Sequence, residues 1–216
     1  PFIGGAGILI LAVVLLFTTT KEPAVEDLPH PEEHLQSEEE QAVGALKGVS
    51  VVPKKYRKSL FALLGAIFLL FIAYDGIGTF FTSYAVNELG VSEGFAPTLF
   101  GLAGVTFILF TIPAGFIGAK FGRRRTIIAG ILLFGIDMAL GYFVTSSTQM
   151  GIILAISGIG WAMINVNTLP LVIDTSEDER LLGTYTGLYY LASQIGSAIA
   201  PVMMGTVIDL FGSNFK

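Results

Sequence analysis

The sequence predicts an all-α fold: a polytopic bundle of about six transmembrane helices. Of the 216 residues, 53% are hydrophobic and 13% are charged, whereas roughly a quarter of residues are charged in an ordinary soluble domain. Of the 29 charged residues, 14 lie within residues 18–58, which leaves too few charges elsewhere to cover a water-soluble globule. The mean hydropathy of +0.73 and the 26 glycines are typical of helices that pack closely in a membrane.

Six apolar runs account for the predicted spans. A helix rises about 1.5 Å per residue, so about 20 residues cross the roughly 30 Å of hydrocarbon in a bilayer. The first run begins within apolar sequence, with neither an initiator Met nor a basic segment before it. We therefore expect it to be the end of a longer helix and the chain to be a fragment. The runs cover residues 1–17, 59–84, 97–119, 126–144, 150–173 and 181–210, and we expect residues 211–216 to be a truncated end.

The hydrophilic stretch of residues 18–58 sets the predicted orientation. It is rich in Glu and Pro and poor in aromatic residues, so we expect a largely flexible linker that cannot fold alone. If successive spans alternate in direction, eleven of the twelve Lys and Arg residues lie on one side of the membrane. The loops predicted on the other side, residues 85–96 and 145–149, contain none. Because Lys and Arg near span ends are retained in the cytoplasm, the linker is predicted to be cytoplasmic.

Two carboxylates lie at bilayer depth in this assignment. A charged carboxylate there costs about 2.5 to 3.5 kcal/mol on insertion scales, so each needs a partner, a water-filled cavity or a proton. Asp75 lies in the second span, and Thr79 follows it one turn later on the same helical face. Asp137 lies near the centre of the fourth span between apolar neighbours. We interpret the two acids as candidate proton- or ion-coupling residues and Thr79 as a candidate substrate contact. For Asp75 the alternative is a structural hydrogen bond to a neighbouring helix. For Asp137 the alternative is an acid that is neutralised by protonation or paired with a residue in a missing part of the chain.

The fifth predicted span combines an aromatic ring, amides and a proline. Trp161 and Asn165 lie one turn apart on one face. Pro170 has no N–H to donate to the carbonyl of Val166, which predicts a kink or a local break. Broken helices at this depth are typical of transporter binding sites. We therefore interpret Trp161 and Asn165 as candidate substrate contacts, with helix packing as the alternative.

The sixth predicted span carries hydroxyl, aromatic and amide groups. Tyr185 and Tyr189 are one turn apart, and Gln194 lies close to the midplane. Side chains of these types hold a polyhydroxylated solute by hydrogen bonds and stacking, or they join neighbouring helices. We interpret all three as candidate substrate contacts.

One predicted cytoplasmic loop resembles a family signature. Residues 115–124, GFIGAKFGRR, resemble the pattern Gly-x-x-x-Asp-(Arg/Lys)-x-Gly-Arg-(Arg/Lys) of the major facilitator superfamily. In that superfamily the pattern lies between the second and third helices of each six-helix half. Ala119 stands where the pattern has its acid. The matching residues are Gly115, Lys120, Gly122, Arg123 and Arg124.

Three further segments and the linker extend the resemblance over nearly the whole chain. The segments YDGIGTFFTSYA, GIGWAMINVN and GTYTGLYYL are similar to segments of the glycoside, pentoside and hexuronide cation symporters and of the related sucrose-proton symporters. Residues 18–58 resemble the loop between the two halves of such transporters. The resemblance implies that residues 1–17 end the last helix of the N-terminal half and that residues 59–210 form five helices of the C-terminal half. It also implies that the N-terminal half of the same protein is a partner.

The resemblance and the intramembrane acids together predict a secondary active transporter in the plasma or inner membrane. We expect it to move a sugar-like solute together with a cation, in the simplest case a proton, by alternating access. An export-type facilitator of drugs, lipids or other organic solutes shares every argument about the fold and is the nearest alternative. A membrane receptor that does not transport is a third.

Composition argues against other classes of function. The chain has no Cys, which removes disulfide frameworks, thiolate catalysis and Cys-ligated metals. Its two histidines, His30 and His34, lie in the linker in the string HPEEH, which does not have the HExxH spacing of metalloproteases. We therefore expect no enzyme, no metal site and no cofactor. With a net charge of -5, the chain shows no footprint of nucleic-acid binding either.

Overall fold

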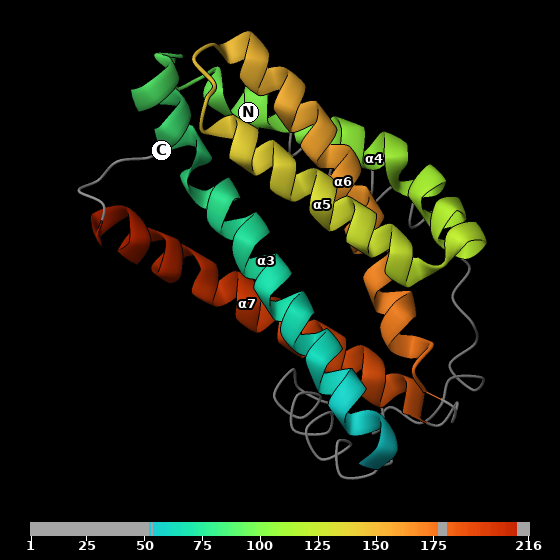
Figure 1. The fold of residues 1–216 in the computed structure, drawn as a ribbon. Coiled ribbons are helices and arrows are strands. Elements are labelled where there is room, and N and C mark those ends of the chain that lie inside the picture. Colours follow the sequence, from blue (N-terminus) through green and yellow to red (C-terminus); the bar gives the residue numbers. More distant parts are fainter. Residues whose placement is uncertain (1–51, 53, 177–180, 211–216) are drawn as a thin grey trace, which may run out of the picture. The chain divides into compact units, whose positions relative to one another are not determined.

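Five α-helices make up the part of the chain that the structure describes. The structure is a computed structural model, and it describes residue 52, residues 54–176 and residues 181–210. The first predicted span, nearly all of the predicted linker before Lys54 and residues 211–216 lie outside the described residues. The all-α fold predicted from composition is confirmed. The helices, shown in Figure 1, are α3 (Lys54–Leu89), α4 (Ala96–Phe121), α5 (Arg123–Gly141), α6 (Ser147–Ile173) and α7 (Leu182–Leu210).

Four of these helices, α3, α4, α6 and α7, are long and apolar enough to cross a membrane, judged by length and composition. They correspond to the second, third, fifth and sixth predicted spans. The fourth predicted span forms α5, a helix of 19 residues that begins with Arg123–Arg125 and contains Asp137. Its longest stretch without a charged residue, residues 126–136, is therefore shorter than that of the other four helices.

Glycines allow the helices to pack closely in two groups. α6 packs against α4 and α5, and α3 packs along α7, with weaker contacts that join the two groups (Figure 1). At Gly158 of α6, an added Cβ would lie 2.2 Å from the carbonyl oxygen of Ala103 in α4. At Gly196 of α7, an added Cβ would lie 2.6 Å from the carbonyl oxygen of Phe68 in α3. Backbone approach of this kind is how small residues join helices in a membrane.

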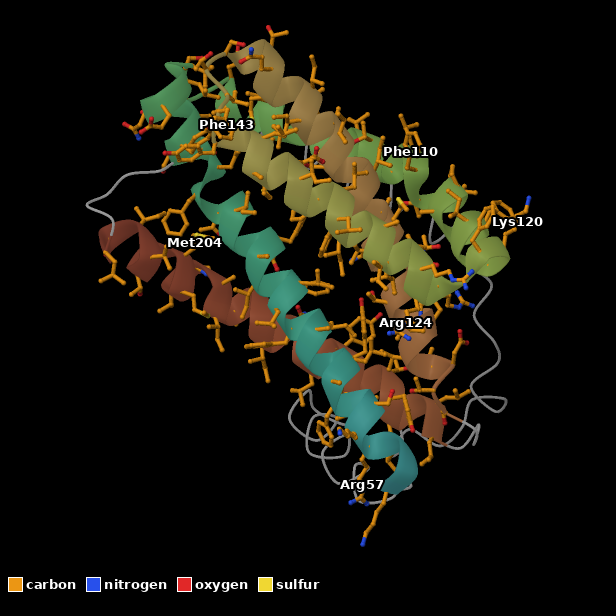
Figure 2. The ribbon with its side chains drawn as sticks, in the orientation of Figure 1. Arg57, Phe110, Lys120, Arg124, Phe143 and Met204 are labelled. Carbon is orange, nitrogen blue, oxygen red and sulfur yellow. The ribbon has the colours of Figure 1, made fainter. Side chains whose placement is uncertain are left out.

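Large apolar side chains cover much of the outer surface of the helices. Phe143, which follows α5, is 75% exposed, and Phe110 of α4 is exposed as well (Figure 2). A water-soluble protein rarely exposes contiguous apolar surface of this kind. The outer faces therefore suit contact with lipid.

A single glycine connects α4 and α5. Gly122 has a φ of 96°, and its N–H donates to the carbonyl of Gly118 at 3.0 Å, which ends α4. A residue with a Cβ is strained in this left-handed region, so glycine is required for the one-residue connection. The backbone conformation therefore explains why the loop signature has a glycine at position 122.

The helix α6 passes through Pro170 without a local break. The sequence predicts a kink or a local break at this proline, and of the two the break does not occur, because α6 is one continuous helix that ends at Ile173. The N–H of Asp174 donates to the carbonyl of Pro170 at 2.8 Å and closes the last turn. Because Pro170 lies so close to the end of the helix, its missing N–H leaves the body of α6 intact.

An ion pair joins the start of α5 to the end of α6. Arg123 Nε donates to Asp174 Oδ2 at 2.7 Å, and the side chains are 33% and 54% exposed. Pairs as exposed as this one contribute roughly 0 to 1 kcal/mol. We therefore expect Asp174→Asn to lower the free energy of unfolding by less than about 1 kcal/mol, measured by thermal unfolding in detergent. A loss of more than about 2 kcal/mol, which exceeds the ordinary range for exposed pairs, would contradict this assignment.

Candidate functional site

A cavity of about 550 Å³ lies between helices of both groups. Its wall comes from α3, α5, α6 and α7 and from Tyr142, the residue that follows α5. Figure 2 labels Met204 of α7, whose side chain contributes to the wall and lies against Gly76 of α3. Small-molecule sites commonly have volumes of about 300 to 1,000 Å³, so the cavity is large enough for an organic solute.

Asp137 supplies the carboxylate of this cavity wall. Its side chain is 2% exposed, and Ser157 of α6 donates a hydrogen bond from its Oγ to Asp137 Oδ2 at 3.3 Å. The bond joins α5 to α6. Among the described residues the structure records one ion pair, Arg123–Asp174, so Asp137 has no basic side chain as a partner there. A buried carboxylate without a counter-charge is costly unless it binds a proton or a cation.

Asp75 lies in the contact between α3 and α7. Ser197 of α7 donates a short hydrogen bond from its Oγ to Asp75 Oδ2. Thr79, one turn later on α3, is exposed and donates from its Oγ1 to the backbone carbonyl of Asp75 at 2.7 Å. Asp75, one of the two acids predicted for ion coupling, therefore takes part in a hydrogen bond that joins two membrane-spanning helices.

Trp161 packs among aromatic rings of other helices. Its indole stacks on the ring of Tyr74 in α3, with centroids 3.9 Å apart and planes within 4° of each other. The ring of Phe71 meets it edge-on at 5.5 Å, and Phe134 of α5 lies 6.2 Å away. This aromatic cluster of Phe71, Tyr74, Phe134 and Trp161 joins α3, α5 and α6, which is the packing alternative to the predicted substrate contact.

Two of the tyrosines predicted in the sixth span are buried between helices. Tyr185 is 1% exposed in a core that includes Leu60 of α3 and Val172 of α6. The hydroxyl of Tyr189 lies 3.4 Å from the hydroxyl of Thr168 in α6, where either group can donate. Both rings therefore connect α7 to its neighbours.

The predicted site residues do not converge on the cavity. Asp137 lines it, whereas Gln194 and Thr79 are exposed on α7 and α3, and Asn165 is half-buried on α6. Trp161 does not line the cavity itself. It belongs to a core group against which Met138 and Ile77 pack, and these two residues line the cavity.

Asn167 has a structural role that the sequence does not reveal. It is completely buried, and its Nδ2 donates to the carbonyls of Ala114 in α4 at 3.1 Å and of Met163 at 2.9 Å. The amide lies directly over Gly118, where an added Cβ would overlap it. The pairing involves residues about fifty positions apart, so helical spacing within α6 gives no signal for it.

The signature residues lie at and around the junction of α4 and α5. Gly115 faces Val166 of α6, whose side chain would lie 3.5 Å from an added Cβ. The ammonium of Lys120 lies 5.4 Å from the ring centroid of Phe121, and Arg124 is exposed (Figure 2). Basic side chains thus gather at one end of these helices, as the predicted cytoplasmic orientation requires.

Comparison with curated proteins identifies relatives that are transporters. The chain is 25% identical over 203 residues to an uncharacterised major-facilitator-type transporter of Methanocaldococcus jannaschii, covering 92% of this chain and 48% of the relative. It is 30% identical over 148 residues to dipeptide and tripeptide permease B of Shigella dysenteriae, covering 64% of this chain and 29% of the relative. It is 23% identical over 150 residues to the drug efflux pump JefA of Mycobacterium tuberculosis, covering 68% and 28%.

The chain spans about half the length, or less, of the curated relatives it matches. No solved structure matches it significantly. The family model of the Major Facilitator Superfamily matches residues 1–201, which is most of the sequence. The chain therefore belongs to the Major Facilitator Superfamily.

Proposed function

We propose that the protein performs secondary active transport of a small organic solute by alternating access, with a proton as the coupling ion. Members of its family are carriers rather than enzymes, and the named relatives are transporters. The observation that carries the proposal is the hydrogen bond from Ser197 to Asp75, which places a carboxyl group between α3 and α7. The plasma or inner membrane is part of the proposal, and so is the N-terminal half of the same protein as the opposite wall of the solute path.

The coupling role of Asp75 follows from the cost of charge in a membrane. A carboxylate at bilayer depth favours its neutral, protonated form unless water or a cation reaches it. Asp75 is only half-buried, and its carboxyl group accepts from a hydroxyl on another helix. A change in the packing of α3 against α7 therefore changes the environment of the acid, which ties proton release to the side that is open.

A sugar-like solute is the first candidate for the cargo. This candidate is supported by the resemblance to glycoside and sucrose symporters and by three polar side chains that are exposed or half-buried. These are Thr79, Asn165 and Gln194 on α3, α6 and α7. Trp161, Tyr185 and Tyr189 would contact such a solute only after a rearrangement, because they are now packed between helices.

An exported organic solute is the second candidate, and a different observation favours it. The cavity of about 550 Å³ is lined mostly by apolar side chains, which suits a hydrophobic molecule better than a sugar. One named relative is a drug efflux pump and another is a peptide permease.

Transport in proteoliposomes separates these candidates. The full-length protein is reconstituted, a pH gradient is imposed, and the movement of labelled lactose and of ethidium is followed with and without a proton uncoupler. Uncoupler-sensitive uptake of lactose supports sugar symport, and uncoupler-sensitive movement of ethidium without competition by lactose supports export. Binding of either probe with no flux in any gradient would contradict transport and favour a receptor.

A further inference from the structure

We infer that Asn167 of α6 is a positioning residue for the signature loop, residues 115–124: its amide holds the α4 end of the loop on α6, so that the loop and α6 move as one body. The contact itself is measured without transport, whereas the joint movement rests on the proposed function, because α6 moves in a transport cycle. Asn167 is not among the residues that line the cavity, so its amide is placed for a contact between helices and not for the solute.

The amide of Asn167 contacts the backbone of α4 through both of its polar atoms. Nδ2 donates to the carbonyl of Ala114 at 3.1 Å. Oδ1 is buried without an N–H or O–H partner among the described residues, and it overlaps the position that a Cβ of Gly118 would take. The hydrogen that Gly118 carries in place of a Cβ therefore points at Oδ1, which is the weak C–H···O contact that recurs between packed helices. Glycine at position 118 is what lets the amide come this close.

The start of α5 has little local stabilisation. Its N-cap is Gly122, which has no side chain to accept from the free N–H groups of the first turn. That turn contains Arg123–Arg125 and no acid, although positive charge is unfavourable at the positive end of a helix dipole. Ala119 stands where the family pattern has its acid, so position 119 offers no carboxylate either. The junction of α4 and α5 therefore depends on contacts with another helix.

Two contacts with α6 hold this junction, and Asn167 makes the buried one. The carbonyl of Gly118, beside the amide, accepts from the N–H of Gly122 at 3.0 Å, which ends α4. Arg123 follows at once and pairs with Asp174, about two turns beyond Asn167. The path from α6 through the loop thus returns to α6. The buried contact is the stronger of the two, because water screens the exposed ion pair.

The test is hydrogen–deuterium exchange of the purified full-length protein in detergent, read over residues 115–126. The N–H of Gly122 exchanges when its bond to Gly118 opens, so its rate measures how often the junction leaves its docked position. We expect Asn167→Leu, which removes the amide, to accelerate exchange there by about 5- to 150-fold, the factor for a buried polar group that loses its partner. Exchange over residues 147–160, at the opposite end of α6, is expected to stay unchanged.

Three further variants separate positioning from a general loss of stability. Thr168→Val alters the neighbouring buried residue, whose hydroxyl faces Tyr189 of α7 and not α4, and is expected to leave exchange over residues 115–126 unchanged. Gly118→Ala places a Cβ against the amide and is expected to accelerate this exchange from the α4 side, so it repeats the test if Asn167→Leu does not fold. Asp174→Asn is expected to accelerate it by less than about fivefold, the factor for an exposed ion pair.

Transport kinetics test the joint movement. In proteoliposomes, Asn167→Leu is expected to lower the maximal rate of solute exchange and to leave the KM unchanged, because Asn167 does not line the cavity and the loop no longer follows α6. An unchanged maximal rate in a variant whose junction exchanges faster would overturn the joint movement.

Failure of this inference is distinguishable from failure of the proposed function. Equal acceleration along the whole of α6, or the same acceleration in Asn167→Leu and Thr168→Val, would overturn the positioning role, whatever the transport assay shows. Unchanged exchange over residues 115–126 in Asn167→Leu would overturn it as well and leave the proposed function standing. Local acceleration in a protein that moves neither transport probe would support the positioning role and contradict transport.

Discussion

Replacing Asp75 by Asn is expected to abolish proton-driven accumulation of the solute while leaving exchange of solute across the membrane intact. The amide keeps the size of the side chain and an oxygen for the hydrogen bond from Ser197, but it cannot release a proton. One pH unit supplies about 1.4 kcal/mol, which supports roughly a tenfold concentration ratio for one proton per solute. In Asp75→Asn this ratio is expected to fall to about one.

Two controls distinguish coupling from damage to the fold. Ser197→Ala removes the hydroxyl donor and keeps the carboxyl group of Asp75, so it is expected to retain accumulation. Counterflow of labelled solute without a gradient measures exchange directly. Accumulation in Asp75→Asn at the level of the unmodified protein would contradict the coupling role of Asp75.

Gly158→Ala is expected to disrupt the contact between α6 and α4. The new Cβ would lie 2.2 Å from the carbonyl oxygen of Ala103 and 2.1 Å from Oγ1 of Thr106. A flexible side chain can move aside, but the backbone of α4 cannot move without changing its whole contact with α6. Overpacking of a buried contact costs typically about 1 to 3 kcal/mol and sometimes more, and we expect the upper end here.

Thermal unfolding in detergent measures this effect. A loss of about 3 kcal/mol corresponds to a decrease in Tm of roughly 6 to 12 °C for a domain of this size. Gly104→Ala on α4 is the matched control, because an added Cβ there meets nothing within 4 Å. It is expected to leave Tm unchanged or to raise it slightly, since alanine favours helix. Equal Tm values for the two variants would contradict the close approach at Gly158.

The helices were predictable from the apolar runs because hydrocarbon thickness and helical rise leave little freedom in span length. The sixth run, residues 181–210, matches α7 within one residue at its start. The second apolar run begins at residue 59, whereas α3 begins at Lys54, since a basic segment outside the hydrocarbon still continues the helix. Hydropathy marks the part of a helix that lies in lipid and not its last polar turn.

The candidate site was only partly predictable. Asp75 and Asp137 stand out in the sequence because acids are rare in apolar runs. Their partners, Ser197 and Ser157, lie on other helices, and no spacing within one helix indicates them. For the same reason the face of Trp161 looked available for a solute, although Tyr74 covers it in the structure.

The orientation of α4 gives the most direct test of the membrane arrangement on which the proposed transport depends. Glu93 precedes α4 and Arg124 follows it, both are exposed, and the 216 residues given contain no Cys. Glu93→Cys and Arg124→Cys are labelled with an impermeant maleimide in intact and in permeabilised cells. We predict that Glu93→Cys is labelled in intact cells and Arg124→Cys only after permeabilisation. Labelling of both positions from the same side would contradict a membrane-spanning α4.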